Sequence, residues 1–250
     1  MSTIRVLDER FFGGRVRRWW NRNAVLGGGW GEFIARVEAV PAGAVVLDLG
    51  AGEAELRARL QHARYIAIDR GIGHAGWDYS KLDAVADGLA VPLADGSCDL
   101  VVSKQVLEHM TEPARAIAEI ARVLKPGGRV LLSTNQAWPQ HQKPFDFFRF
   151  TSYGLRYLFE QAGLEIVRME AMGGAFSVAL FQFSQTLSPH LWARSERGRR
   201  IAGLITKPFA LVMRALMPLV TLLDRRDRAR DNTLGWYVEA RAPQASNIEA

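Results

Sequence analysis

This chain of 250 residues has only one cysteine, and it lacks long uninterrupted apolar runs and a complete dinucleotide-binding glycine motif. The single cysteine, Cys98, excludes an internal disulfide and a cysteine-based metal site, and it fits a reducing cytoplasm. The first residues lack the apolar core of a secretory signal peptide, so we expect a cytoplasmic protein. With 48% hydrophobic and 23% charged residues, the composition is that of a folded protein with a substantial core.

The strongest signal is an apolar, strand-like run followed by a tight glycine turn. Gly50 and Gly52 allow the backbone to approach a ligand closely. The third glycine of the G-x-G-x-x-G pattern is replaced by Glu55, and Glu53 stands where a pyrophosphate would lie. Asp48, two residues before the first glycine, adds more negative charge. The turn therefore favours a cationic ligand, such as the ammonium of a methionine group, over NAD.

Short apolar runs alternate with amphipathic stretches from residue 44 onward, which predicts βα units around a parallel sheet. The predicted strands cover residues 44–49, 64–69, 82–86, 98–103, 128–134, 164–170 and 234–242. The predicted helices cover residues 53–61, 104–109, 112–124 and 151–162. Thr151 is the expected N-cap of the last helix, and the sequence from Lys125 to Gly128 predicts a helix stop followed by a turn.

Four regions are expected along the chain. An N-terminal helical cap covers 1–40, and one α/β domain is built from 41–174 together with 234–242. Residues 175–233 form a basic, apolar helical insertion within that domain, and 243–250 form a disordered tail. Residues 175–234 hold 10 basic and 4 acidic side chains, a net charge of +6 that equals that of the whole chain.

Four motifs follow one another in a fixed order. They are Asp48 to Gly52, Asp69 at the end of the second strand, Ala86-Asp87-Gly88-Leu89, and Leu107-Glu108-His109 with the later Lys125-Pro126-Gly127-Gly128. This ordered set resembles the class I S-adenosylmethionine-dependent methyltransferases, and within them the methyltransferase type 11 group. The resemblance implies a Rossmann-like α/β fold with a seven-stranded, mostly parallel sheet and helices on both faces. It also implies S-adenosylmethionine as the cofactor.

The candidate cofactor-binding residues lie at the carboxyl ends of the predicted strands, where open α/β sheets bind ligands. They are Asp48, Gly50, Gly52, Asp69, Asp87, Gly88, Ser103 and Gln105. A carboxylate at position 69 can accept hydrogen bonds from both ribose hydroxyls, with capping of the next turn as the alternative. Asp87 with Gly88 is assigned to the adenine, the alternative being an Asx-turn. Asp48 is assigned to the methionine end, although it alternatively holds the turn together through backbone N–H groups.

A polar and aromatic segment, residues 140–151, follows the fifth strand and is expected to fold over the cofactor; we call it the lid segment. It resembles an H-x-x-D-(aromatic)-x-R-(aromatic)-T segment of methyltransferases from bacterial polysaccharide and lipid-modifying pathways. His141 is the candidate general base because imidazole titrates near neutrality, and Asp146 is the candidate that orients it. The alternative is that Asp146 pairs with Arg149 and pins the segment. Glu108 and His109 are interpreted mainly as structural.

The insertion contains a mostly apolar run, residues 201–223, flanked by arginines. Lys207 and Arg214 inside the run argue against a transmembrane span, since each costs about 2.5–3.5 kcal/mol at the bilayer centre. An interfacial position with arginines at anionic headgroups fits better. A helical lid or a dimer interface remains the alternative. RNA binding is disfavoured because the basic residues surround an apolar run instead of alternating with exposed aromatics.

The sequence thus predicts an S-adenosylmethionine-dependent O-methyltransferase that acts on a lipid-linked or envelope-saccharide precursor at the inner membrane surface. The alternatives are a soluble small molecule or quinone-like lipid as acceptor, or a non-catalytic S-adenosylmethionine-binding subunit. No cluster of metal ligands is evident from the sequence, and nucleic acid is not expected as a partner.

Overall fold

The computed structural model describes residues 29–73, 76–186, 195, 197–198, 212, 215–216 and 218–244. They fall into two compact units. The first unit holds residues 31–170 and 235–244, and the second holds Gly29, Trp30 and the described residues between 171 and 234.

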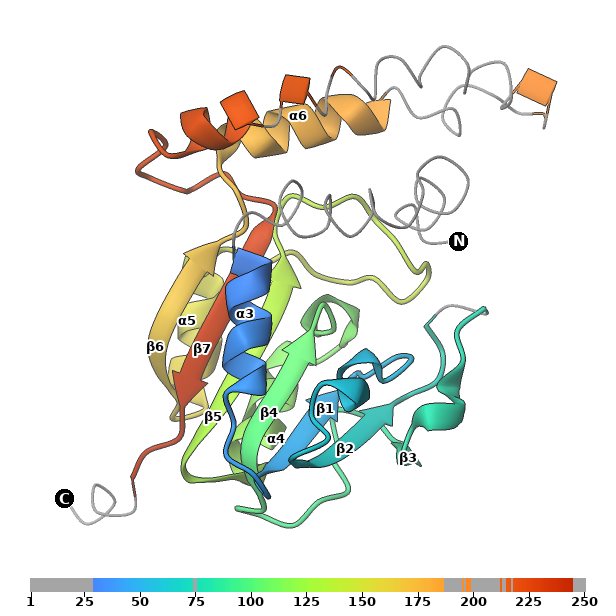
Figure 1. Cartoon of the computed structure of the whole chain (residues 1–250), viewed down its shortest axis with the longest axis vertical. Helices are drawn as coiled ribbons and strands as arrows, with labels where there is room; N and C mark the ends of the chain where they lie inside the picture. Colours follow the sequence, from blue (N-terminus) through green and yellow to red (C-terminus); the bar gives the residue numbers. More distant parts are fainter. Residues whose placement is uncertain are drawn as a thin grey trace. The chain divides into compact units, whose positions relative to one another are not determined.

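The first unit is built around a seven-stranded sheet with the strand order β3-β2-β1-β4-β5-β7-β6 (Figure 1). The strands are β1 (Val45–Leu49), β2 (Arg64–Asp69), β3 (Ala84–Val85), β4 (Cys98–Lys104), β5 (Leu124–Asn135), β6 (Glu165–Ala171) and β7 (Gly235–Arg241). The pairs β1–β2, β2–β3, β1–β4 and β4–β5 are parallel, whereas β7 runs antiparallel to β5. The sequence prediction of a seven-stranded, mostly parallel sheet is confirmed.

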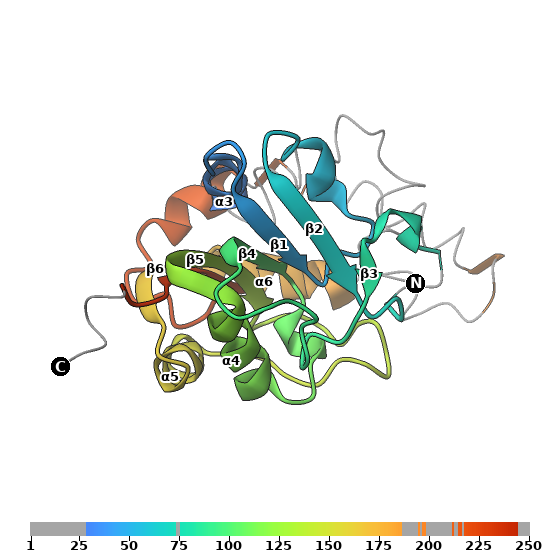
Figure 2. The same ribbon diagram turned by 90° about the horizontal axis from the view of Figure 1, so that it is seen from below.

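Helices cover both faces of this sheet (Figures 1 and 2). Helix α3 (Gly29–Glu38) lies on one face, and α4 (Pro113–Val123) and α5 (Ser152–Gln161) lie on the other. Helix α4 buries residues at helical spacing, namely Ala116, Ile117, Ile120 and Val123. Thr151 caps α5 as predicted, since its side-chain oxygen accepts a hydrogen bond from the backbone N–H of Gly154 at 3.1 Å.

Two predicted helices, 53–61 and 104–109, are not α-helices. The first is reduced to the 3₁₀ turn η1 (Glu55–Ala58), and the second to the 3₁₀ turn η3 (Leu107–His109). In each case a residue in the left-handed region precedes the turn, Ala54 with φ +53° and Gln105 with φ +56°. A non-glycine residue with positive φ cannot continue a right-handed helix, so both segments stay short.

Strand boundaries also differ from the predictions. The strand predicted at 82–86 is only the two-residue β3, preceded by the 3₁₀ turn η2 (Tyr79–Lys81). The strand predicted at 128–134 begins earlier, at Leu124, directly after α4. Its register against β4 shifts between Cys98 and Leu100, so the predicted glycine turn is accommodated as an irregularity inside β5.

In the second unit, helix α6 (Ala175–Thr186) is held by a carboxylate far along the chain. The buried Asp224 accepts hydrogen bonds from the backbone N–H groups of Gly174, Phe176 and Ser177 at 3.0–3.2 Å. Negative charge at this position complements the positive end of the helix dipole. The carbonyl of Met172 accepts hydrogen bonds from the Thr233 hydroxyl at 2.9 Å and from the Leu234 N–H at 3.2 Å.

Several expectations fall outside the described residues. These are most of the predicted N-terminal cap, most of the apolar run at 201–223 and all but the first two residues of the predicted disordered tail. Within the described part of the chain, no helix combines the length and the apolar character that crossing a bilayer requires.

Candidate functional site

The carboxyl ends of β1, β2, β3, β4 and β5 bring most of the predicted site residues to one edge of the sheet. At this edge the chain connection changes direction, because β1 lies between β2 and β4 in the strand order. Open α/β sheets bind their ligands at such a switch point.

The turn after β1 has the geometry that the two glycines predict. Gly50 has φ +76°, and a Cβ atom at this position would lie 2.4 Å from the side chain of Val106. Gly52 has φ +56°, and a Cβ atom there would lie 3.3 Å from the ring of Trp77. Both positions have a left-handed backbone that favours glycine, and at Gly50 a Cβ atom would also clash with Val106.

Asp69 links this turn to the loop after β2. Its Oδ2 atom accepts a hydrogen bond from the backbone N–H of Gly52 at 3.0 Å, and its Oδ1 atom accepts one from Gly71 at 2.8 Å. Each carboxylate oxygen has two acceptor positions, so each retains one for a further donor. Two such acceptors side by side suit a pair of adjacent hydroxyl groups, as in a ribose.

Asp48 does not hold the turn through backbone N–H groups, as the alternative interpretation supposed. It is buried in β1, and its carboxylate accepts a short hydrogen bond from the hydroxyl of Tyr65 on β2. Burial raises the pKa of Asp48 to about 6, and the hydrogen bond from Tyr65 opposes this rise. The role of Asp48 toward the methionine group stays a prediction.

Asp87 forms the Asx-turn that was the alternative to adenine binding, since its Oδ1 atom accepts a hydrogen bond from the Leu89 N–H at 3.0 Å. Its Oδ2 atom lies 3.7 Å from Nε of Arg70. A Cβ atom on Gly88 would lie 2.4 Å from the terminal methyl group of Met110, so a larger residue here requires that flexible side chain to move. The contact of Asp87 and Gly88 with adenine remains a prediction.

Ser103 and Gln105 lie at the end of β4. Ser103 is buried within the strand, whereas the amide of Gln105 donates to the hydroxyl of Ser133 on β5 at 3.3 Å. Their role toward the cofactor stays a prediction. Lys104, the last residue of β4, forms an ion pair with Glu55 at 3.0 Å.

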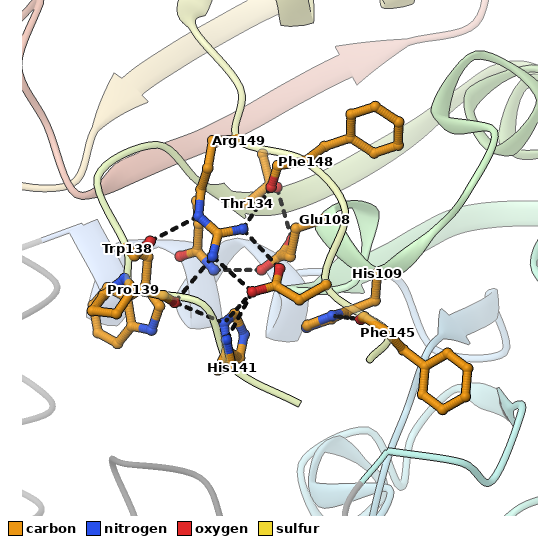
Figure 3. Close-up of polar contacts among 11 residues, drawn as sticks. Glu108, His109, Thr134, Trp138, Pro139, His141, Phe145, Phe148 and Arg149 are labelled. Atoms are coloured by element: carbon orange, nitrogen blue, oxygen red, sulfur yellow. Dashed lines mark hydrogen bonds and ion pairs between the residues drawn. The ribbon is translucent and has the colours of Figure 1, made fainter. Parts of the chain in front are cut away.

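The lid segment is pinned by Arg149, as the alternative interpretation of this region proposed (Figure 3). Its guanidinium donates to both carboxylate oxygens of Asp146 at 2.7 and 2.8 Å, and to the carbonyls of Trp138 at 2.8 Å and Pro139 at 3.0 Å. This contact holds the pKa of the almost completely buried Asp146 carboxyl down at about 2, even though burial acts in the opposite direction.

His141 contacts the same carboxylate. Its backbone N–H donates to Oδ2 of Asp146 at 2.8 Å, and its Nδ1 atom lies 3.3 Å from that oxygen and 3.2 Å from the carbonyl of Pro139. Because both neighbours are acceptors, the proton of the neutral ring belongs on Nδ1, which leaves a lone pair on Nε2. Burial and the neighbouring His109 lower the pKa of His141.

Glu108 and His109, interpreted from sequence as structural, occupy the centre of this region (Figure 3). Glu108 is fully buried; it accepts hydrogen bonds from the Thr134 hydroxyl at 2.8 Å and the Asn135 amide at 2.5 Å. Burial raises the pKa of Glu108 to about 7 and lowers that of His109. The rings of His109 and His141 meet edge to face with their centroids 4.7 Å apart.

Sequence reasoning missed this arrangement because the lid segment is anchored to η3 through its backbone. The carbonyl of Glu108 accepts hydrogen bonds from the N–H groups of Phe147 and Phe148, and Nδ1 of His109 lies 2.5 Å from the carbonyl of Phe145. One feature of the sequence could have indicated this arrangement. Glu108 and His109 come just after the fourth strand, at the same edge as the cofactor residues.

Comparison with known proteins assigns the chain to a family. The family model described as "Methyltransferase domain" matches residues 47–132. A probable S-adenosylmethionine-dependent methyltransferase of Mycolicibacterium smegmatis is 35% identical over 180 residues, which cover 66% of this chain and 67% of the relative. The chain belongs to the class I S-adenosylmethionine-dependent methyltransferases, and the resemblance stated from its motifs is confirmed.

Two further comparisons are more limited. The mouse tRNA (carboxymethyluridine(34)-5-O)-methyltransferase ALKBH8 is 30% identical over 128 residues, but this chain covers only 18% of its length. The Haemonchus contortus phosphoethanolamine N-methyltransferase 2, solved in complex with S-adenosyl-L-methionine, has a TM-score of 0.54 at 18% identity. That likeness covers 98% of this chain and 60% of the other, and it supports the fold.

Proposed function

We propose that this protein transfers the methyl group of S-adenosylmethionine to an oxygen atom of its acceptor. The observation that supports the cofactor side of the proposal is the carboxylate of Asp69, fixed between the two glycine loops by the N–H groups of Gly52 and Gly71. This cradle leaves an acceptor position on each oxygen for the two ribose hydroxyls. The sulfonium of the bound cofactor supplies an electrophilic methyl group.

The proposed cofactor site extends along the strand ends on either side of Asp69. Gly50 and Gly52 bring the backbone close to the methionine end, and the acidic surroundings, which include Asp48, suit its ammonium. Asp87 and Gly88 receive the adenine, and Ser103 and Gln105 lie beside the methionine half. The main contribution of these residues is alignment, because an in-line approach to the methyl carbon supplies much of the acceleration.

The acceptor lies on the side of the lid segment in this proposal. His141 is its catalytic residue and promotes proton loss from the acceptor hydroxyl. Asp146 holds the ring of His141 in one tautomer, and Arg149 holds Asp146. The nitrogen that accepts the proton is Nε2 of His141, since Nδ1 is directed at two oxygens.

The proposed acceptor is a lipid-linked or envelope-saccharide precursor at an anionic membrane surface. Exposed apolar side chains in the second unit support this, namely Val212, Leu216, Leu219 and Leu222. Within the helical stretch 218–224, Leu219 and Leu222 share one face, opposite the buried Val220 and Asp224. Exposed arginines follow directly at 225, 226 and 228, where they can meet phosphate headgroups.

Calorimetric titration with S-adenosylmethionine and S-adenosylhomocysteine tests the cofactor site. We expect micromolar binding that Asp69→Ala weakens by at least about tenfold, because a hydrogen bond to a charged group contributes about 1.5–3 kcal/mol. Asp69→Asn, which keeps one oxygen acceptor, should give an intermediate affinity. Asp95→Ala, at an exposed carboxylate paired with Arg122, is the matched control. Absence of binding to the folded wild-type protein would contradict the proposal.

A further inference from the structure

The Nε2 atom of His109 is buried and has no hydrogen-bond partner, and it is the one buried side-chain nitrogen or oxygen of this kind in the described part of the chain. An unpaired buried lone pair is costly, so its presence calls for an explanation. The other ring nitrogen of His109 faces the carbonyl of Phe145, which fixes the proton on Nδ1 and directs the lone pair on Nε2 elsewhere.

His141 has the same arrangement. Its Nδ1 atom is directed at the carbonyl of Pro139 and the carboxylate of Asp146, and its lone pair is again on Nε2. Two histidines in contact thus both lack a proton on the same ring nitrogen. Histidine ligands of metal ions have this feature, in which one nitrogen donates to a carbonyl or carboxylate and the other binds the metal.

Glu108 supplies a carboxylate beside these two histidines. Its carboxylate is fully buried, and its two hydrogen-bond donors, Thr134 and Asn135, are neutral. Arg149, the nearby cation, directs a two-bond fork at Asp146. The donor atoms of Glu108, His109 and His141 all lie within 4.8 Å of one another. Since bonds of about 2.0–2.2 Å allow two ligands on one ion to lie up to roughly 4.4 Å apart, small side-chain rotations close the cluster.

We infer that Glu108, His109 and His141 form a binding site for a divalent transition-metal ion at the acceptor side of the active site. Two imidazoles and one carboxylate are a recurrent ligand set that leaves further coordination positions open. A cation here supplies the missing partner of the His109 lone pair and balances the buried charge of Glu108. It also joins η3 to the lid segment, because two ligands come from the former and one from the latter.

The inference deepens the proposed function. The part that concerns the reaction rests on that function, whereas the part that concerns metal binding does not. The acceptor hydroxyl coordinates the ion at an open position, which lowers the pKa of the hydroxyl, and its proton passes to water. The resulting oxygen forms a bond to the methyl carbon. The carbon–sulfur bond breaks, and its electron pair stays on sulfur as S-adenosylhomocysteine leaves. In the metal-bound form Nε2 of His141 is a ligand and does not itself accept the proton, and the ion takes over that role by lowering the pKa of the hydroxyl.

Titration of the metal-stripped protein with Co²⁺, followed by absorption spectroscopy and by elemental analysis after dialysis, tests the site directly. We expect one bound equivalent with ligand-field bands typical of nitrogen ligands. His141→Ala and His109→Asn should each weaken binding by at least about tenfold, the lower end of what disturbing a metal site costs. His109→Asn keeps a donor for the carbonyl of Phe145 and so preserves the lid anchor.

His62→Gln is the matched control, because His62 lies outside the cluster with its Nε2 at 3.1 Å from the carbonyl of Val40. It should bind Co²⁺ as the wild type does. Binding that is absent in the wild type, or unchanged in both His141→Ala and His109→Asn, would overturn the inference. Because Co²⁺ binding is measured without cofactor or acceptor, it is independent of the S-adenosylmethionine titration that tests the proposed function.

Discussion

Asp48 is a carboxyl group enclosed between two strands, with the hydroxyl of Tyr65 as its hydrogen-bond donor. Its pKa rises from 3.8 in the unfolded chain to about 6 in the folded protein, so the native state binds more protons between these values. Stability contributed by this group is therefore present at pH 4 and falls as the pH rises toward 6.

Asp48→Asn should remove this pH dependence, because the amide keeps an acceptor for Tyr65 and carries no charge. Relative to the wild type, the free energy of unfolding should increase by up to about 3 kcal/mol at pH 7.5, the equivalent of a shift of about two pKa units. At pH 4 the difference should be small. Urea denaturation at both pH values measures it.

Tyr65→Phe should act in the opposite direction, since it leaves the buried carboxylate without its donor. We expect a loss of about 1–3 kcal/mol at pH 7.5 and a smaller loss at pH 4, where Asp48 is protonated. Equal losses at the two pH values would show that the ring packing of Tyr65, and not its hydroxyl, determines the stability.

At the scale of elements, the lid segment depends on a single planar guanidinium. Arg149→Lys replaces four directed hydrogen bonds to Asp146, Trp138 and Pro139 by a point charge that cannot match their geometry. Amide hydrogen exchange in the lid segment should accelerate by at least about tenfold, corresponding to about 1.4 kcal/mol of local stability. Exchange in β4 and β5 should stay slow.

Gln140→Ala, an exposed position in the same segment, is the control and should leave the exchange pattern unchanged. If Arg149→Lys and the control were indistinguishable, the anchors through Glu108 and His109 would be sufficient to hold the segment.

The elements that the sequence predicted well have local signals. The N-cap at Thr151, the turn at Gly50 and Gly52, and the strands with continuous apolar runs all depend on neighbouring residues. The sequence did not predict that two of the expected helices shorten to 3₁₀ turns. The 3₁₀ turn at Glu55–Ala58 follows a left-handed Ala54, and no residue pattern announces that conformation.

Some features of the candidate site could be predicted from local sequence, and others could not. The position of Asp69 at the end of β2 was predictable because an apolar strand-like run precedes it, whereas its role toward a ribose stays a prediction. The grouping of Glu108, His109 and His141 was not, since η3 and the lid segment are joined by backbone hydrogen bonds between residues about 40 positions apart. The partner of Asp48 was missed for a similar reason, because Tyr65 lies on a different strand.

At the scale of the whole molecule, the proposed membrane contact predicts a lipid-dependent partition. The wild type should cosediment with vesicles of phosphatidylglycerol and phosphatidylcholine, and less with phosphatidylcholine alone or at high salt. Leu219→Asp combined with Leu222→Asp should reduce binding by at least about tenfold, because burying each leucine contributes about 1.5–3 kcal/mol.

Tyr153→Ser combined with Tyr157→Ser removes a comparable exposed apolar pair from α5 in the first unit and should leave vesicle binding unchanged. Equal vesicle binding by the wild type and the double leucine variant would exclude this helical face as the membrane contact. The titration with S-adenosylmethionine would be unaffected by that outcome.

The carbonyl of Met172 receives hydrogen bonds from both Thr233 and Leu234, so the chain that departs after β6 returns to nearly the same point before β7. The segment between Met172 and Thr233 therefore leaves and rejoins the rest of the chain at closely spaced points, and we call it the excursion. Such a segment can be lengthened, shortened or exchanged in evolution without altering the register of β7 against β5. Replacing this excursion would therefore change the proposed membrane contact and leave the strand order of the sheet unchanged.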